Sequence, residues 1–189
     1  MGAFVIADPG IAAALLAGRK TEMRVIARSP LATAAPGDRI AVREACIPAR
    51  IVGGKLHATA RGRAELVVFA DGWRQHRDGS HERGRGPTDD YSQWLGAMHM
   101  PAWATRLTLV VESVRPGRLH AMTRTEARAE GAIPLLAGLL WRWPGPAGSR
   151  YLDPRRAFQA HWDLLHAPGD RWADDPDVVT IGFRVERGG

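Results

Sequence analysis

The stretch that organises this chain is residues 18–24, Gly-Arg-Lys-Thr-Glu-Met-Arg. It follows a short apolar segment that carries helix signals at both ends. Asp8 and Pro9 suit the first turn of a helix, and Gly18 suits the left-handed residue that closes one. We therefore predict a short helix whose end fixes the loop that carries these polar side chains, an arrangement often used for functional residues. The alternative interpretation is a solvated, charged turn.

Length and composition indicate one globular protein. The chain has 189 residues, of which 45% are hydrophobic, so it can bury a core of its own. No apolar run approaches the roughly 18 residues that cross a bilayer, and the start of the chain lacks the pattern of a signal peptide. We expect a cytoplasmic protein with no membrane partner. The single cysteine, Cys46, cannot form an internal disulfide and is expected to serve packing.

The charge balance favours anionic partners. The chain has 26 Lys+Arg against 20 Asp+Glu, a net charge of +6, and arginine greatly outnumbers lysine. Arginine suits planar contacts to phosphates and base edges. The high content of Ala, Arg and Gly can also result from the nucleotide composition of the source genome. The positive charge by itself therefore favours a nucleic-acid partner only modestly.

Alternation of apolar residues predicts several short strands. Residues 39–44 alternate cleanly after the turn signal Pro36-Gly37-Asp38, and they place Glu44 on the apolar face. A buried carboxylate needs a partner, so Glu44 is either a salt-bridged structural residue or part of a polar pocket. The remaining strands are expected over residues 48–52, 64–70, 106–114 and 178–185.

Two further helices are expected in the second half of the chain. Thr123 and Glu126 form a capping box that begins a short helix, which ends at Glu130 before Gly131. Glu130 then lies at the negative end of the helix dipole, which costs about 0.3–1 kcal/mol unless a cation such as Lys20 is near. An exposed glutamate at a frayed helix end is the alternative. The last helix opens at Asp153-Pro154.

Residues 71–99 are dominated by Gly, Arg, His and Asp and lack clear periodicity. Aromatic residues are set among them: Trp73, Tyr91 and Trp94. Basic residues interleaved with aromatics suit single-stranded nucleic acid or a flipped base, and a poorly ordered insertion is the alternative. The histidines in or near this segment match no metal-ligand spacing: His76, His81 and His99. We expect no metal site and no cofactor.

The predicted elements indicate an α+β fold, a small, mostly antiparallel β-barrel with short flanking helices. We expect residues 1–189 to form a single domain with a long polar insertion at about 71–99. The sequence pattern alone predicts no more about function than a basic protein for which nucleic acid is a candidate partner.

Several motifs also resemble the ASCH domain family, in particular its longer members from phages and prophages. In the family's order they are Gly18-Arg19-Lys20-Thr21-x-x-Arg24, Pro36-Gly37-Asp38-Arg39-Ile40-x-Val42-Arg43-Glu44, Met100-Pro101-x-Trp103-Ala104-x-Arg106, Glu130-Gly131, and an aromatic helix before a final strand. The resemblance implies a PUA-like β-barrel related to RNA-binding domains. It also implies a cleft lined by the Gly-x-Lys loop, where Lys20 faces Glu130.

Members of that family have been assigned RNA or nucleotide binding, and some are hydrolases. One branch deacetylates acetylcytidine nucleosides with a Thr–Lys–Glu set, and others are ribonucleases. The threonine of that branch lies three residues after the lysine, where this chain has Met23, and Thr21 is out of register. Glu22 and Arg24 also come one residue early. These departures favour binding, whereas the retained lysine and glutamates favour an enzyme.

Metal-independent hydrolysis needs a nucleophile, a base and a cation for the oxyanion. The catalytic candidates are Lys20, Thr21 and Glu130, with Glu130 as the base and Lys20 activating Thr21 or water. Arginines would hold the oxyanion or phosphate, and a tryptophan would stack the base. The substrate-binding candidates are Glu22, Arg24, Arg43, Glu44, Trp73, Trp103 and Arg106.

Three hypotheses follow. The favoured one is an RNA- or nucleotide-binding protein, expected to be a monomer. The second is a hydrolase acting on RNA or a modified pyrimidine nucleoside. The last is a non-catalytic phage structural or partner-binding protein.

Overall fold

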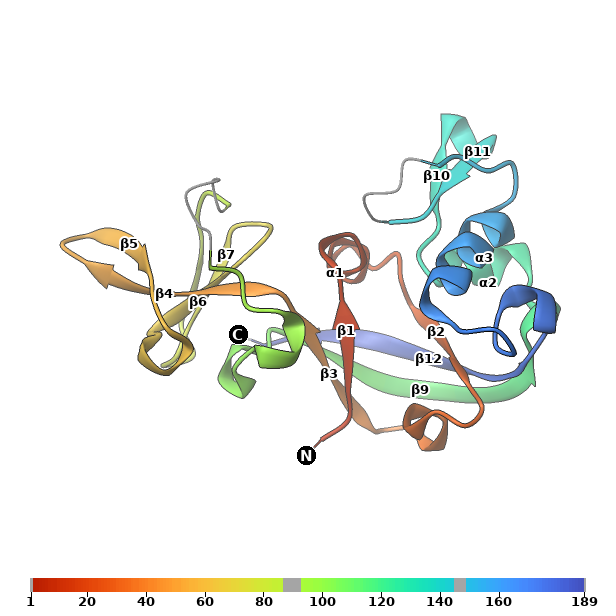
Figure 1. Ribbon diagram of the computed structural model, residues 1–189, viewed down its shortest axis with the longest axis horizontal. Coiled ribbons are helices and arrows are strands. Elements are labelled where there is room, and N and C mark those ends of the chain that lie inside the picture. Colours follow the sequence, from red (N-terminus) through yellow and green to blue (C-terminus); the bar gives the residue numbers. More distant parts are fainter. Residues whose placement is uncertain (1, 87–92, 145–148, 189) are drawn as a thin grey trace. The chain divides into compact units, whose positions relative to one another are not determined.

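Strands dominate the structure, a computed structural model that describes residues 2–86, 93–144 and 149–188. The fold is α+β, with a curled half-barrel sheet and three short α-helices among these residues (Figure 1). The helices are α1 (Pro9–Leu16), α2 (Arg124–Ala129) and α3 (Pro154–Leu165). The strands are β1 (Phe4–Ala7), β2 (Glu22–Ile26), β3 (Arg39–Glu44), β4 (Cys46–Val52), β5 (Lys55–Ala58), β6 (Leu66–Phe69), β7 (Trp73–His76), β8 (His81–Arg83), β9 (Leu107–Arg118), β10 (Ile133–Leu135), β11 (Leu140–Arg142) and β12 (Asp177–Arg187). The predicted α+β class is confirmed, and the PUA-like barrel stays a prediction.

The chain divides into two compact units, each made of separate segments. The first unit comprises Met1–Ala12, Ile40–Thr108 and Glu186–Gly189, and the second comprises Ala13–Arg39 and Leu109–Val185. The expectation of a single domain over residues 1–189 stays a prediction.

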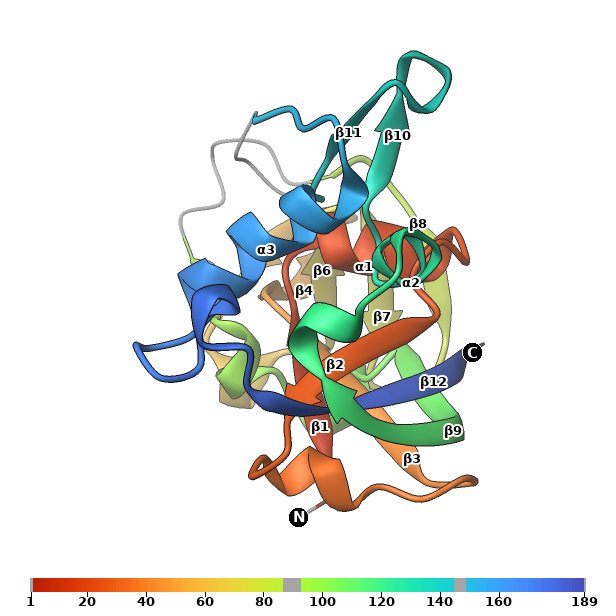
Figure 2. The same ribbon diagram turned by 90° about the vertical axis from the view of Figure 1, so that its right-hand side faces the viewer.

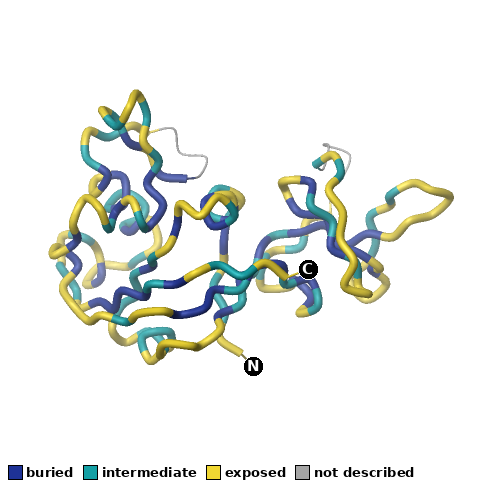
Figure 3. Tube along the Cα trace, turned by 180° about the vertical axis from the view of Figure 1, so that it is seen from behind, coloured by how far each residue is buried: buried dark blue, intermediate teal, exposed yellow. Residues whose placement is uncertain are grey.

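In the first unit, β1 pairs with β3 in parallel, and a second sheet has the antiparallel order β5-β4-β6-β7-β8. All four residues of β6 and the first four of β4 are buried, and dark blue in Figure 3 marks the buried residues of the chain. These two strands contribute to a core cluster on each of their faces. One face contributes to the core cluster Cys46, Val67, Phe69, Met100 and Ala104, and the other forms the cluster Ile47, Ala49, Leu66 and Val68. Both strands match predicted ranges.

The polar segment 71–99 is more regular than its composition indicates. Strands β7 and β8 pair as an antiparallel hairpin, and β7 continues the sheet from β6. Gln75 of β7 is buried, and its amide donates to the carbonyls of Gly79 and Ser80 at 3.2 and 3.4 Å. Residues 73–83 are therefore an ordered hairpin rather than an irregular loop. Tyr91, another aromatic residue expected in this segment, lies outside the described residues.

In the second unit the strand order is β9-β12-β2, and β2 is antiparallel to β12. Helices α2 and α3 pack against each other, and the hairpin β10–β11 contacts α3 (Figures 1 and 2). The core of this unit includes Leu109, Val111, Met122, Ala127, Phe158, Trp162, Ile181 and Phe183. In β9, Leu107, Leu109 and Val111 are buried as the predicted alternation requires, but Val110 on the opposite face is buried as well, so the alternation is incomplete.

The helix ends are those that the sequence predicts. The Ile11 amide donates to Asp8 Oδ1 at 2.8 Å, and Gly18 adopts a φ of 66° beyond the end of α1. Helix α2 has both bonds of its capping box, between Thr123 and Glu126. No helix in the described part of the chain is both long enough and apolar enough to span a membrane.

Candidate functional site

Lys20 and Glu130 meet at the point where α2 ends. The Lys20 ammonium donates to Glu130 Oε2 at 2.9 Å, to the Glu130 carbonyl at 2.8 Å and to the Glu22 carbonyl at 2.9 Å. The next amide, that of Thr21, donates to the Ala129 carbonyl at 2.8 Å. The loop after α1 therefore satisfies carbonyls that the last turn of α2 leaves without partners. Both side chains are buried, with exposed fractions of 11% for Lys20 and 3% for Glu130.

Arg24 extends this pair into a larger cluster. Its guanidinium binds Glu130 Oε1 at 3.2 Å and Glu126 Oε2 at 3.1 Å. Arg115 of β9 binds Glu22 at 2.8 Å and Glu126 at 3.3 Å. The resulting charged network has three cations and three carboxylates: Lys20, Arg24, Arg115, Glu22, Glu126 and Glu130. Its charges balance, as burial requires.

Glu22 differs from the other carboxylates of the charged network. Its Oε2 atom is buried and has no hydrogen-bond partner in the described part of the chain. Burial raises the pKa of the Glu22 carboxyl above its ordinary value, and the attraction of Arg115 and Arg24 offsets this only in part. A carboxylate with a raised pKa and a free oxygen is suited to accept a proton or a hydrogen bond.

Met23 lies on the other face of β2 from Glu22 and Arg24, because successive side chains of a strand alternate. Met23 is 8% exposed and pairs in register with Ile181 of β12. The position where the resemblance implies a catalytic threonine is therefore filled here by a core residue.

Thr21 is exposed and lies beside Lys20, but only its backbone joins the cluster. All three bonds of the Lys20 ammonium go to carbonyl or carboxylate oxygens. An ammonium held in this way has no lone pair with which to take a proton from Thr21. The geometry thus brings the expected catalytic residues together without the predicted activation of Thr21 by Lys20.

Glu44 and Arg106 form a second buried ion pair, in the first unit. The Arg106 guanidinium donates to both oxygens of Glu44, at 2.8 and 2.6 Å, and to both oxygens of Asp71 at 2.9 Å. It also lies over the Phe69 ring, 4.1 Å from the centroid. Of the two predictions for Glu44, the salt-bridged structural residue is the one that these contacts match.

The two tryptophans predicted to stack a base both pack against the core cluster around Cys46. The Trp73 ring stacks on His81 with centroids 4.6 Å apart and an interplanar angle of 15°. Arg77 lies over the Trp103 ring at 6.0 Å. The ring contacts of Trp73 and Trp103 are thus already made within the protein.

Arg43 completes the set of predicted residues. Its guanidinium donates to the Met98 carbonyl at 3.0 Å and lies over the Phe4 ring at 4.5 Å. The predicted residues therefore fall into two groups. The second unit holds Lys20, Thr21, Glu22, Arg24 and Glu130. The first unit holds Arg43, Glu44, Trp73, Trp103 and Arg106.

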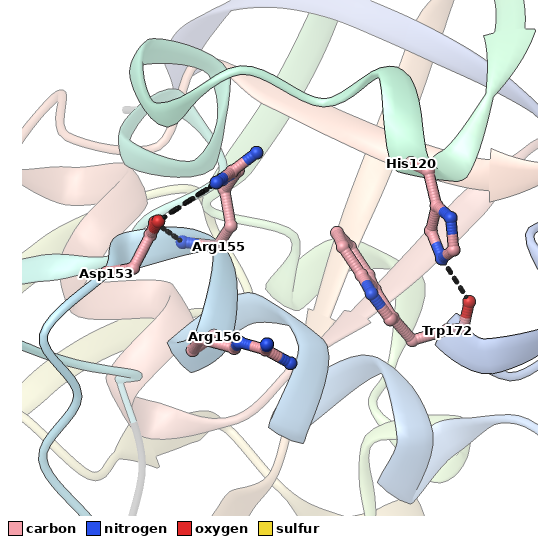
Figure 4. A pocket seen from close by; sticks show the side chains of 5 residues that line it. All are labelled: His120, Asp153, Arg155, Arg156 and Trp172. Atoms are coloured by element: carbon pink, nitrogen blue, oxygen red, sulfur yellow. Dashed lines mark hydrogen bonds and ion pairs between the residues drawn. The ribbon is translucent and has the colours of Figure 1, made fainter.

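Sequence reasoning did not assign site roles to Glu126 or Arg115. Glu126 is recognisable only as a capping residue, and nothing in the sequence links Arg115 to β2. Sequence reasoning also missed a pocket in the second unit with a volume of about 290 Å³ (Figure 4). It is lined by His120, Asp153, Arg155, Arg156 and Trp172.

Comparisons of the chain with models of protein families, with curated proteins and with solved structures found no match. The function is therefore inferred from the chemistry of the residues and from the sequence motifs.

Proposed function

We propose that this chain is an ASCH-type, PUA-like protein that binds RNA or a nucleotide at its charged network. The observation that carries the proposal is the meeting of Lys20 and Glu130, residues 110 positions apart, in one buried cluster. The family resemblance implies that pairing, and the net charge of +6 favours a polyanionic ligand.

Arg115 is the member of the charged network best placed to meet a ligand. Its side chain is 53% exposed, whereas that of its partner Glu22 is 19% exposed. A phosphate that binds the Arg115 guanidinium would draw it away from Glu22 and uncover the carboxylate. The uncovered carboxylate would then accept a hydrogen bond from the exocyclic amine of a base, as glutamate does with cytosine N4.

Metal-independent hydrolysis is the second candidate function. The environment of the Glu22 carboxyl favours it. Both oxygens of Glu130 are held, one by Lys20 and the other by Arg24. Glu22 has the free oxygen and the raised pKa that a general base needs. We therefore place the base at Glu22 rather than at Glu130. Met23 in the core gives no support to a threonine nucleophile at that position.

The test compares binding of a labelled single-stranded RNA to the wild type and to Arg115→Gln. We expect Arg115→Gln to weaken binding about tenfold, the value of one charge-assisted contact. Arg19→Gln is the matched control, because Arg19 is exposed and lies next to Lys20 of the charged network without belonging to that network. Equal affinities for the wild type and Arg115→Gln, or an equal loss in both variants, would remove the proposal. Glu22→Gln separates the two functions, because its amide oxygen can still accept a hydrogen bond from a base but cannot act as a general base. This variant should therefore lose any turnover of RNA or acetylcytidine while it still binds RNA.

A further inference from the structure

The pocket in the second unit shares no residue with the charged network. Three segments line it: the 3-10 helix Leu119–Ala121, the first turn of α3, and the 3-10 helix Trp172–Asp174 (Figure 4). Its volume of about 290 Å³ lies near the lower end of the range for small-molecule sites. A single small ligand is therefore the right size of occupant.

One side of the pocket is aromatic and held in place. The His120 ring nitrogen Nε2 lies 2.6 Å from the Trp172 carbonyl, and the two rings are tilted by 39° with centroids 5.1 Å apart. The Trp172 amide donates to Asp163 Oδ1 at 2.7 Å, and the Trp172 ring makes a T-shaped contact with the Phe158 ring. A fixed indole of this kind is a stacking surface for a planar ring.

The opposite side is cationic. Arg155 binds Asp153 at 3.1 Å, so that the aspartate is already neutralised. Arg156 donates to the Gln159 amide oxygen at 2.8 Å and forms no ion pair with any carboxylate in the described part of the chain. Two arginines against one aspartate leave one net positive charge in the lining when His120 is neutral. Figure 4 shows the Arg156 guanidinium pointing toward Trp172.

The acidic residues behind the aromatic side have their own partners. Asp175 accepts from the His120 amide at 2.7 Å and pairs with Arg118 at 3.2 Å. Asp174 accepts from the amides of Gly169 and Arg171 at 2.9 and 3.0 Å. An anion in the pocket therefore meets the free charge of Arg156 before it meets an unpaired carboxylate.

We propose that this pocket binds a nucleoside monophosphate, with its base against Trp172 and its phosphate on Arg156 and Arg155. A planar ring joined to a dianion is the ligand chemistry that an indole facing an arginine recognises. The choice of ligand rests on the proposed nucleotide-related function, whereas the pocket itself does not. Such a group comes from a free nucleotide or from the 5′-phosphate end of an RNA.

The test measures binding of uridine monophosphate, uridine and inorganic phosphate by calorimetry. We expect the monophosphate to bind at least tenfold more tightly than either of its parts. Arg156→Gln should weaken binding of the monophosphate about tenfold. Arg142→Gln should leave it unchanged, since Arg142 is an exposed arginine in β11 that does not line the pocket. Trp172→Phe keeps an aromatic ring, so it controls for misfolding in Trp172→Ala, which should lose the monophosphate. Oligonucleotides with and without a 5′-phosphate distinguish the two sources.

The proposal is overturned if phosphate binds as well as the monophosphate, or if Arg156→Gln binds like Arg142→Gln. The Arg115→Gln variant separates this outcome from failure of the proposed function. If Arg115→Gln weakens RNA binding but Arg156→Gln leaves mononucleotide binding unchanged, only the inference about the pocket is wrong. If Arg156→Gln weakens mononucleotide binding but Arg115→Gln leaves RNA binding unchanged, only the proposed function is wrong.

Discussion

Lys20 binds Glu130 through two chemically different oxygens, the carbonyl at 2.8 Å and the carboxylate at 2.9 Å. The carbonyl belongs to the residue that caps the C-terminus of α2, where the helix dipole is negative. One ammonium therefore stabilises both the helix end and the glutamate side chain that would otherwise oppose the dipole.

Removing this ammonium should destabilise the protein strongly. We expect Lys20→Met to lower the free energy of unfolding by about 3 kcal/mol, because it leaves Glu130 Oε2 and the carbonyls of Glu22 and Glu130 without their donor, while Arg24 alone still compensates the buried carboxylate. Urea unfolding measures the change. Arg19→Met is the control, since Arg19 is the exposed neighbour and carries the same charge. Equal midpoints for the two variants would show that the pair contributes little.

Asp71 should stabilise the fold at neutral pH and lose that effect in acid. Burial opposes its ionisation, but hydrogen bonds and attraction from Arg106 outweigh burial and lower the pKa of Asp71 below its ordinary 3.8. A lowered pKa contributes stability that is present above the unfolded value and is lost as the pH falls through the folded one. Asp71→Asn should therefore be less stable than the wild type at pH 7. The gap should close below pH 3.8, and a gap that is constant with pH would contradict the assignment.

Glu22 should show the opposite dependence. Because burial raises its pKa above the ordinary 4.5, its ionisation costs stability at neutral pH. That cost is absent below the unfolded pKa and grows as the pH rises through the folded one. Glu22→Gln should accordingly be more stable than the wild type at pH 7 and equal to it well below pH 4.5. Thermal unfolding over this range measures the difference, and a Glu22→Gln variant that is less stable at pH 7 would contradict the prediction.

Cys46 should be unreactive in the folded protein. Burial, with a smaller effect of Glu44, raises the pKa of its thiol to about 12, so the reactive thiolate is scarce at pH 8. An aromatic disulfide reagent should label it at least a hundredfold more slowly in the native protein than in urea. Rapid labelling without denaturant would show that the thiol is accessible.

The sequence predicts those parts of the fold that local patterns control. The capping box of α2 is visible because Thr123 and Glu126 contact each other three residues apart. The β7–β8 hairpin cannot be predicted from the sequence, because its Arg, Gln and His residues do not follow a strand pattern. The strand conformation of β7 is instead stabilised by its pairing with β6.

The site shows the same limit. Lys20 and Glu130 were identifiable from family-like motifs and from a carboxylate at a helix end. One oxygen of Glu126, Oε2, accepts from the Thr123 amide in the capping box and also binds Arg24. Only the capping bond can be recognised from the three-residue spacing in the sequence. Arg115 joins the network through the position of β9 beside the other strands, which no local pattern encodes. Trp73 and Trp103 were predicted to face a ligand because composition cannot distinguish a stacking surface from a residue packed on a core.

The two compact units alternate along the chain, with the main chain passing between them after residues 12, 39, 108 and 185. Any backbone break between residues 14 and 184 therefore yields two fragments that each carry residues of both units. Truncation from either end therefore cannot isolate one unit intact, and an internal deletion of residues 40–108 would still leave residues 1–12 and 186–189 of the first unit in place.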